Sequence, residues 1–187
     1  MADPNFSLEE RKALLNLARY AIEAPLKPVG KPPAFENTPA LCSQRGAFVT
    51  IKKQGSLRGC IGTFVSSNAV TQTVQEMAQA AAFEDPRFPP LRGEEIPDID
   101  LEISVLTPMQ PVKNVEEIEV GKHGIYIVQG RCRGVLLPQV ATENCWDRKT
   151  FLEQTCCKAG LNPNCWKEKG TQIFIFSAEI FGEKEED

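Results

Sequence analysis

The chain is poor in the residues that build metal and cofactor sites. It has a single histidine, His123, among 187 residues. Its cysteines lack the C-x-x-C spacing of zinc sites, which need three or four converging ligands. No G-x-x-x-x-G-K-[ST] or G-x-G-x-x-G segment occurs, so no motif favours a bound nucleotide. We therefore expect no metal and no cofactor.

Long apolar runs are also absent. None approaches the ~20 residues that span a bilayer, and the first ten residues lack the basic-then-apolar order of a signal peptide. The sequence thus predicts a cytoplasmic protein without membrane contact. In a reducing cytosol we expect the seven cysteines to be free thiols. An odd number of cysteines also fits a closed disulfide framework poorly.

An excess of positive charge is the third absence. The chain has 21 Lys and Arg against 25 Asp and Glu, a net charge of −4. The basic residues are scattered, whereas a protein that binds nucleic acid usually shows a basic stripe. Nucleic acid is therefore disfavoured as a partner.

The N-terminal segment predicts one helix followed by a connection. Ser7 and Glu10 have the spacing of a capping box, and apolar residues then recur at helical spacing. Pro25 ends this helix. Residues 25–39 contain five prolines, and we expect them to run over the surface.

The rest of the chain repeats one order of elements. A hairpin, a helix and a strand are predicted at 46–64, from about 67, and at 101–106; the same order returns at 124–137, 147–159 and 172–180. Hairpins combined with helices indicate antiparallel sheets with packed helices, the α+β class.

The repeated order leads to a hypothesis about domain organisation. A chain of this length can form one domain of two intimate subdomains. We take residues 1–187 as a single domain with a core over about 8–180. Its two halves, about 46–106 and 124–180, are interpreted as an internal duplication of a β-β-α-β unit.

The segment from Leu57 to Gly62 is the strongest candidate for a site. On a strand, Arg58 and Cys60 share a face, and a guanidinium beside a thiol favours the reactive thiolate. Gly59 and Gly62 leave room for another backbone or a ligand. The alternative interpretation is that Cys60 is a small buried hydrophobic residue. Sequence alone leaves these two interpretations level.

Other residues complete the hypothetical site. Because His123 is the only histidine, any cysteine–histidine dyad must use it; a loop histidine more often bonds backbone. Glu102 is a weak candidate to orient it, as a carboxylate does in a catalytic triad. Asp85 and Arg87 lie among prolines. Asp85 can pair with Arg87 or cap a turn, and the stiff loop can wall a pocket.

These segments together resemble the signature of the AMMECR domain family, named for a chromosomal region linked to Alport syndrome, midface hypoplasia and elliptocytosis. The matching segments are Leu57–Gly62, Asp85–Phe88, Glu102–Leu106, Gly121 with His123–Gly124, Gly134–Val140, Phe151–Leu152, Lys158–Leu161 and Trp166. The resemblance covers roughly residues 8–180.

The resemblance implies a two-part α+β domain that occurs alone in archaea and eukaryotes. It also implies fusion to, or genomic association with, Memo-like and radical-SAM proteins, which are therefore expected partners. It implies no established reaction. A role in nucleic-acid processes has been inferred for the family on indirect grounds.

The resulting hypothesis is cysteine-dependent chemistry on a small molecule in a pocket around Cys60. Arg58 would activate the thiol electrostatically and His123 would act as acid or base. Gly59, Gly62, Glu102, Asp85 and Arg87 would bind the ligand. The alternative is a non-catalytic module that binds a ligand or a protein through the same cleft, and a weaker alternative is a regulatory protein associated with nucleic acid.

Overall fold

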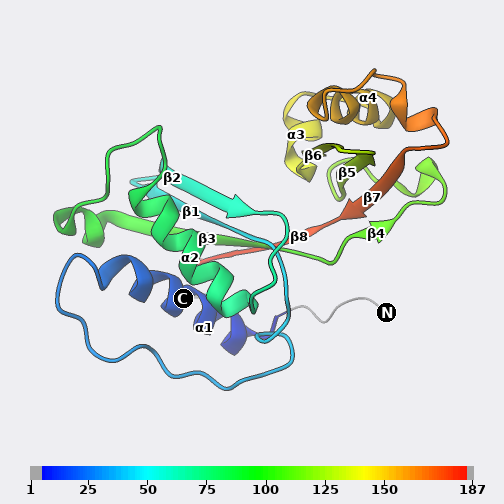
Figure 1. Ribbon diagram of the computed structural model, residues 1–187. Coiled ribbons are helices and arrows are strands. Elements are labelled where there is room, and N and C mark those ends of the chain that lie inside the picture. The colour runs from blue at the N-terminus through cyan, green and yellow to red at the C-terminus, as the bar shows by residue number, and fades with distance from the viewer. Residues whose placement is uncertain (1–5, 185–187) are drawn as a thin grey trace. The chain divides into compact units, whose positions relative to one another are not determined.

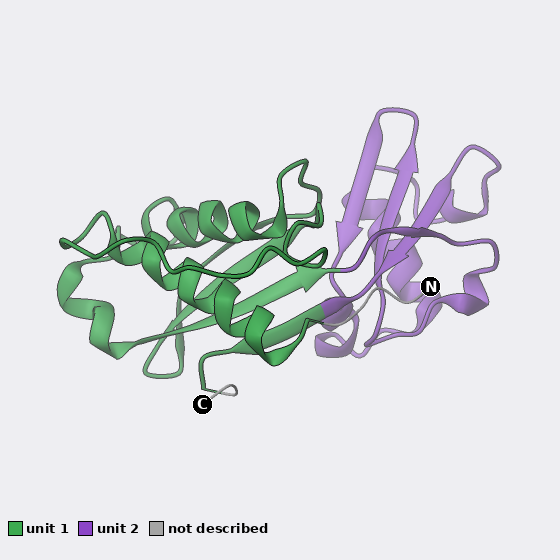
Figure 2. Cartoon of the chain, turned by 90° about the horizontal axis from the view of Figure 1, so that it is seen from below, with its two compact units in different colours: residues 1–106, 179–187 green, residues 107–178 purple. Residues whose placement is uncertain are grey.

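The chain folds into two compact units, seen in a computed structural model that describes residues 6–184 (Figures 1 and 2). Unit 1 comprises residues 1–106 and 179–187, and unit 2 comprises residues 107–178. Each unit has its own four-stranded sheet and its own hydrophobic core. Helices on antiparallel sheets confirm the predicted α+β class.

Unit 1 places two helices on one face of a sheet (Figure 1). The sheet order is β2-β1-β3-β8. Val49, Ile51, Leu101 and Ile103 point into the core beneath the helices and are at most 1% exposed. The elements are α1 (Leu8–Glu23), β1 (Ala47–Lys53), β2 (Ser56–Thr63), α2 (Val70–Phe83), the 3-10 helix η1 (Gly93–Asp98), β3 (Ile99–Leu106) and β8 (Ala178–Gly182).

The predicted local signals of unit 1 are confirmed. The Glu10 N–H donates to Ser7 Oγ at 3.3 Å, and the Ser7 N–H donates to Glu10 Oε2 at 2.7 Å, which completes the capping box. Gln54 and Gly55 have φ of 51° and 81°. These left-handed conformations match the right-handed twist of the hairpin strands and close the turn.

Unit 2 also packs helices on a sheet, whose order is β4-β7-β5-β6. Phe151, Leu152 and Cys156 of α4 fill its core together with Ile125 and Ile127. The elements are β4 (Gln110–Pro111), the 3-10 helix η2 (Val115–Glu117), β5 (Gly124–Gln129), β6 (Cys132–Leu136), α3 (Pro138–Glu143), α4 (Arg148–Lys158), the 3-10 helix η3 (Cys165–Lys167) and β7 (Gln172–Phe176).

The two sheets share one strand order, and the internal duplication stays a hypothesis. In unit 1 the second, first and third strands lie side by side as β2-β1-β3, and in unit 2 the same positions are β6-β5-β7. Gly59 opposes Ile51, and Gly134 opposes Ile127. A Cβ at Gly59 would lie 2.2 Å from the Ala81 carbonyl oxygen, so only glycine lets β2 approach α2 this closely.

Gly134 has the same role under the helix of unit 2. A Cβ there would lie 2.5 Å from the Ala159 nitrogen and 2.6 Å from the Thr155 carbonyl oxygen. Each sheet then gains a fourth strand beside its third. That strand is β8 in unit 1 and β4 in unit 2. The strand β4 follows β3 along the chain but joins the sheet of unit 2, and β8 follows β7 but joins the sheet of unit 1.

The predicted element order differs from the structure in several places. The single strand expected over 172–180 is two strands, β7 and β8, which separate at Ser177 and enter different sheets. The short helix α3 begins at Pro138 and was not predicted. Its six residues are too few to show a helical period in the sequence.

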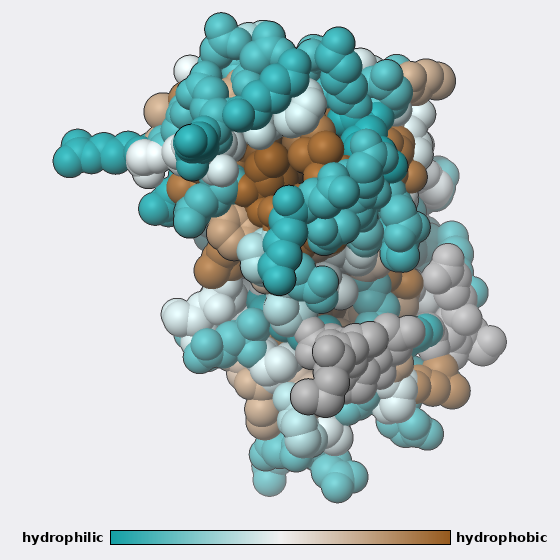
Figure 3. Space-filling view, turned by 90° about the vertical axis from the view of Figure 1, so that its right-hand side faces the viewer, coloured by the Kyte–Doolittle hydropathy of each residue, from teal (hydrophilic) through white to brown (hydrophobic). Residues whose placement is uncertain are grey.

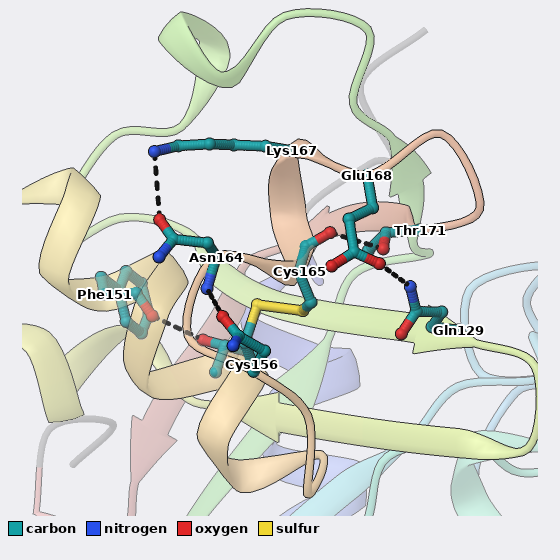
Figure 4. The surroundings of a disulfide bond; sticks show 10 residues. Gln129, Phe151, Cys156, Asn164, Cys165, Lys167, Glu168 and Thr171 are labelled. Carbon is teal, nitrogen blue, oxygen red and sulfur yellow. Dashed lines mark hydrogen bonds between the residues drawn. A yellow bond between two sulfur atoms is a disulfide. The ribbon is translucent and has the colours of Figure 1, made fainter.

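The expectation that all seven cysteines are free thiols is wrong. Cys156 of α4 and Cys165 of η3 form a disulfide with a Cα–Cα distance of 6.1 Å (Figure 4). Both residues are at most 1% exposed. The free cysteines are Cys42, Cys60, Cys132, Cys145 and Cys157. Sequence missed the pair because a helix residue and a loop residue nine positions apart carry no spacing signal.

The disulfide gives a thiol count that can be measured. In denaturant without reductant, five of the seven cysteines should react with a thiol reagent, and all seven should react after reduction. Reduction should lower the free energy of unfolding by about 2–3 kcal/mol, because the bond restricts a short loop in the unfolded chain. Seven reactive thiols before reduction would contradict the bond.

Candidate functional site

The first two signature segments meet at the outer edge of β2. The Cys60 N–H donates to Asp85 Oδ2 at 2.9 Å, and Arg87 Nη2 donates to the Cys60 carbonyl oxygen at 3.2 Å. β2 is an edge strand, whose outward N–H and C=O groups would otherwise be open to another strand. The loop after α2 therefore occupies the edge at Cys60.

Asp85 is the centre of this contact, and its predicted pairing with Arg87 is confirmed. Its side chain is 2% exposed and also accepts from Arg87 Nη2 at 2.7 Å and Nε at 3.0 Å. The hydrogen bond from Arg87 holds the pKa of Asp85 far below its usual value, and the Cys60 N–H adds to this effect. A buried carboxylate with these donors stays ionised.

Arg58 is bound by a different carboxylate. Its Nε and Nη2 donate to the two oxygens of Glu95, each at 3.1 Å, and its side chain is 12% exposed. Lys53 adds a bond of 3.0 Å to Glu95. The pKa of Glu95 falls to about 2, chiefly because of the Arg58 hydrogen bond. Arg58 is therefore committed to Glu95, and Arg87 is the arginine that contacts Cys60.

A register shift explains why Arg58 and Cys60 diverge. Lys53 opposes Ser56 and Lys52 opposes Leu57, but Ile51 opposes Gly59, so Arg58 is an extra residue between the pairs. Such a bulge reverses which face the following residues occupy relative to an unbroken register. The expected common face of Arg58 and Cys60 assumed unbroken alternation.

The shift places the Cys60 side chain on the face of the sheet away from the helices. Cys60 opposes Thr50, and Thr50 opposes Glu102 on its other side. The Thr50 hydroxyl donates to Cys60 Sγ at 3.3 Å. Glu102 accepts from Lys52 Nζ at 2.7 Å. Cys60, Thr50 and Glu102 therefore form a row across three strands, which we call the polar row.

The glycines around Cys60 make room for the chain's own atoms. Gly59 faces the backbone of α2, and a Cβ at Gly62 would lie 2.2 Å from the Phe48 ring. Phe48 in turn packs edge-on against Phe64, with ring centroids 5.0 Å apart. Tight packing thus accounts for both glycines.

His123 lies in unit 2 and is held by its own loop. Its ring Nδ1 accepts from the Glu119 main-chain N–H at 3.1 Å, and the main-chain N–H of His123 donates to the Glu119 carbonyl oxygen at 2.9 Å. Burial, and then Lys122, lower the pKa of His123, which favours the neutral ring that accepts this bond. This is the local backbone role that the sequence favoured for a lone histidine. The dyad with Cys60 stays a prediction.

Sequence reasoning missed two residues of the site, Thr50 and Glu95. Counting outward from the Gln54–Gly55 turn without a bulge would pair Cys60 with Val49, which is fully buried. Only the shifted register brings Thr50 opposite the cysteine. Glu95 lies 37 positions from Arg58 and gave no local signal.

The described residues contain no cluster of three or more His, Cys, Asp or Glu side chains arranged to hold a metal ion. Within the same residues, no helix has the length and apolar character needed to cross a membrane. The surface of residues 6–184 is hollowed by cavities of about 600, 440, 400 and 310 Å³. The smallest of these is lined by Lys52 and Glu102, and Cys60 lines none of the four.

Asp85 gives a prediction about acid stability. A carboxyl whose folded pKa is depressed stabilises the fold above its unfolded pKa of ~3.9, and this contribution is lost as the pH falls below that value. Asp85→Asn should therefore lower the free energy of unfolding at pH 7 by roughly 2–3 kcal/mol. It should also flatten the pH dependence of stability below pH ~4, measured by denaturant unfolding.

Asp98→Asn is the matched control, because Asp98 is exposed in the same unit. This variant should keep the wild-type stability and pH profile. An Asp85→Asn protein with an unchanged acid profile would show that the contact to Cys60 and Arg87 contributes nothing to the fold.

Comparison with known proteins matches nearly the whole chain. The AMMECR1 family model matches residues 15–181. A protein of Methanothermobacter thermautotrophicus is 44% identical over 185 residues, which cover 95% of this chain and 96% of that protein. A protein of Methanosarcina acetivorans is 40% identical, with 94% and 92% covered. The crystal structure of an uncharacterized protein from Pyrococcus horikoshii matches with a TM-score of 0.71 at 38% identity, covering 91% of this chain and 90% of that one.

Proposed function

The chain belongs to the AMMECR1 family, and we propose that it binds a small molecule on the face of the unit 1 sheet away from the helices. The Cys60 thiol is the group that binds this molecule or reacts with it. The observation that carries the proposal is the hydrogen bond from the Thr50 hydroxyl to Cys60 Sγ. This bond gives the sulfur a fixed polar neighbour on the face of the sheet away from the helices. The thiol is half-buried, so a small reagent can still reach it.

Unit 2 supplies an internal comparison that supports this assignment. With Gly134 aligned to Gly59, the positions of Cys60, Thr50 and Glu102 correspond to Val135, Tyr126 and Phe174. The sheet of unit 2 therefore has apolar side chains at the positions where the sheet of unit 1 has the polar row. Because this architecture does not require polar groups at these positions, their presence in unit 1 favours a functional role.

The surroundings of the polar row favour a small polar ligand. The cavity of about 310 Å³ next to Glu102 is lined by charges of both signs, including Lys52 and Asp100. We assign ligand orientation to Glu102 and Lys52, and thiol activation to Thr50. Arg87 adds a positive charge at the Cys60 main chain, and Asp85 holds it in place. Under this proposal Arg58 and His123 take no part in the chemistry.

The second candidate is the non-catalytic module, which would use the same face without thiol chemistry. The observation in its favour is that Cys60 does not line the cavity beside Glu102. Thiol reactivity separates the two candidates, because only the first one requires a reactive Cys60.

The proposal predicts a reactive Cys60 that depends on Thr50. Alkylation by iodoacetamide, followed residue by residue with peptide mass spectrometry, should modify Cys60 faster at pH 7 than the more exposed Cys42 or Cys132. Thr50→Val should slow Cys60 by about two- to tenfold, the range expected for one hydrogen bond of ~0.5–1.5 kcal/mol. The exposed cysteines should keep their rates.

Two variants serve as controls for the alkylation. Thr71→Val makes the same chemical change on α2, away from the thiol, and should leave the Cys60 rate unchanged. His123→Ala should also leave it unchanged, and a slower rate would restore the dyad hypothesis. If Cys60 reacts more slowly than the exposed cysteines and ignores Thr50→Val, the chain is the non-catalytic module.

A further inference from the structure

Unit 2 contains a second cavity that has no part in the polar row. β4 pairs with β7 from Gln110 to Pro111, and the Val112 N–H still donates to the Ile173 carbonyl oxygen at 2.9 Å. Beyond this bond the two backbone segments separate, one leading to η2 and the other to η3. The fork between them is a cavity of about 440 Å³ lined by Pro111, Val112, Lys113, Val115, Trp166, Thr171, Gln172, Ile173 and Phe174. We call it the fork cavity.

The walls of the fork cavity are apolar side chains of the unit 2 core. Val112, Val115, Trp166 and Ile173 are half-buried and pack against that core. Figure 3 views the molecule from the side on which β4 and β7 lie in Figure 1. It shows apolar surface exposed in a hollow between hydrophilic rims. Part of any ligand held here would therefore be apolar.

The charge of the fork cavity has one sign. Lys113 is the only charged residue that lines it, and within residues 6–184 Lys113 forms no ion pair. The carboxylates of neighbouring η2 are already engaged: Glu116 pairs with Arg148, and Glu117 accepts from the Asn114 N–H at 2.9 Å. In a chain of net charge −4, an unpaired cation beside apolar walls favours an anion.

Trp166 lines the same cavity and carries a donor without a partner. Its indole Nε1 is buried and has no hydrogen-bond acceptor among the described residues. A buried N–H group normally has a partner, so one without any calls for an explanation. The exposed Lys167 lies over the indole, with its ammonium 4.8 Å from the ring centroid. Lys167 also donates to Asn164 Oδ1 at 3.1 Å, so its side chain must leave both contacts before a ligand can reach this face of the ring.

The wall that carries Trp166 is fixed in place (Figure 4). The disulfide ties Cys165 to α4, and the Thr171 hydroxyl donates to the Cys165 carbonyl oxygen at 2.6 Å. Gln129 Nε2 donates to Glu168 Oε2 at 2.7 Å. Because this wall is ordered before binding, the entropic cost of ordering it on binding is small.

We propose that the fork cavity binds a small carboxylate with an apolar body. The carboxylate would lie between the Lys113 ammonium and the Trp166 N–H, and the apolar body would lie against Val112, Val115 and Ile173. The site is independent of Cys60 and of the proposed chemistry in unit 1, so either can fail without the other.

The probe pair is phenylacetate and phenethylamine, which have similar apolar bodies and opposite charges. Binding is followed by the NMR signal of the Trp166 indole N–H, with the Trp146 indole as internal reference. Phenylacetate should shift the Trp166 signal saturably, and phenethylamine should not. An equal response to both probes, or no saturable response to phenylacetate, would overturn the proposal.

Variants of Lys113 test the role of the charge directly. Because Lys113 is exposed, we expect these variants to fold as the wild type does. Lys113→Gln should weaken phenylacetate binding about fivefold or more, within the range of one ion pair to a partly desolvated group. Lys113→Arg should restore most of the affinity. Lys169→Gln, at an exposed lysine of the same unit, should leave it unchanged. If Lys113→Gln binds as tightly as the wild type, the proposed recognition is wrong.

Discussion

Arg58 donates two hydrogen bonds of 3.1 Å to Glu95 at the residue where β1 and β2 shift register. The bulge turns every later residue of β2 over, because the side chains of a strand alternate between its faces. Gly59 consequently meets α2, and Cys60 turns away from the core toward Thr50. Without this shift, Cys60 would oppose the fully buried Val49. The register shift thus places a half-exposed thiol on this strand, and the Arg58–Glu95 pair lies at the shifted residue.

The loop after α2 completes the same arrangement from the other side. Asp85 and Arg87 bond both main-chain groups of Cys60 on the open edge of β2. These two bonds fix the backbone of one residue and occupy the edge groups that a further strand would otherwise pair with. The two signature segments are therefore one structural assembly, in which the second positions the backbone of the first.

Comparison of the two sheets shows which features they share and which occur in one unit. Both units place a glycine under a helix, and both bury aliphatic residues on the facing side. They differ on the other face, which is polar around Thr50 and apolar around Tyr126. The polar face belongs to unit 1, and the fork cavity belongs to unit 2. This is why we treat them as separate candidate sites.

The sequence by itself determined the local elements, because their signals lie within a few residues: the Ser7 capping box, the Gln54–Gly55 turn and the order of hairpin, helix and strand. It also offered the pairing of Asp85 with Arg87, two positions apart, as one of the roles of Asp85, and the structure shows this pair. Contacts between distant residues were decided only by tertiary structure. Among them are the Arg58–Glu95 pair, the Cys156–Cys165 bond and the entry of β8 into the first sheet. The face on which Cys60 lies belongs with these, since one extra residue in a strand reverses it and sequence periodicity carries no sign of where that residue is inserted.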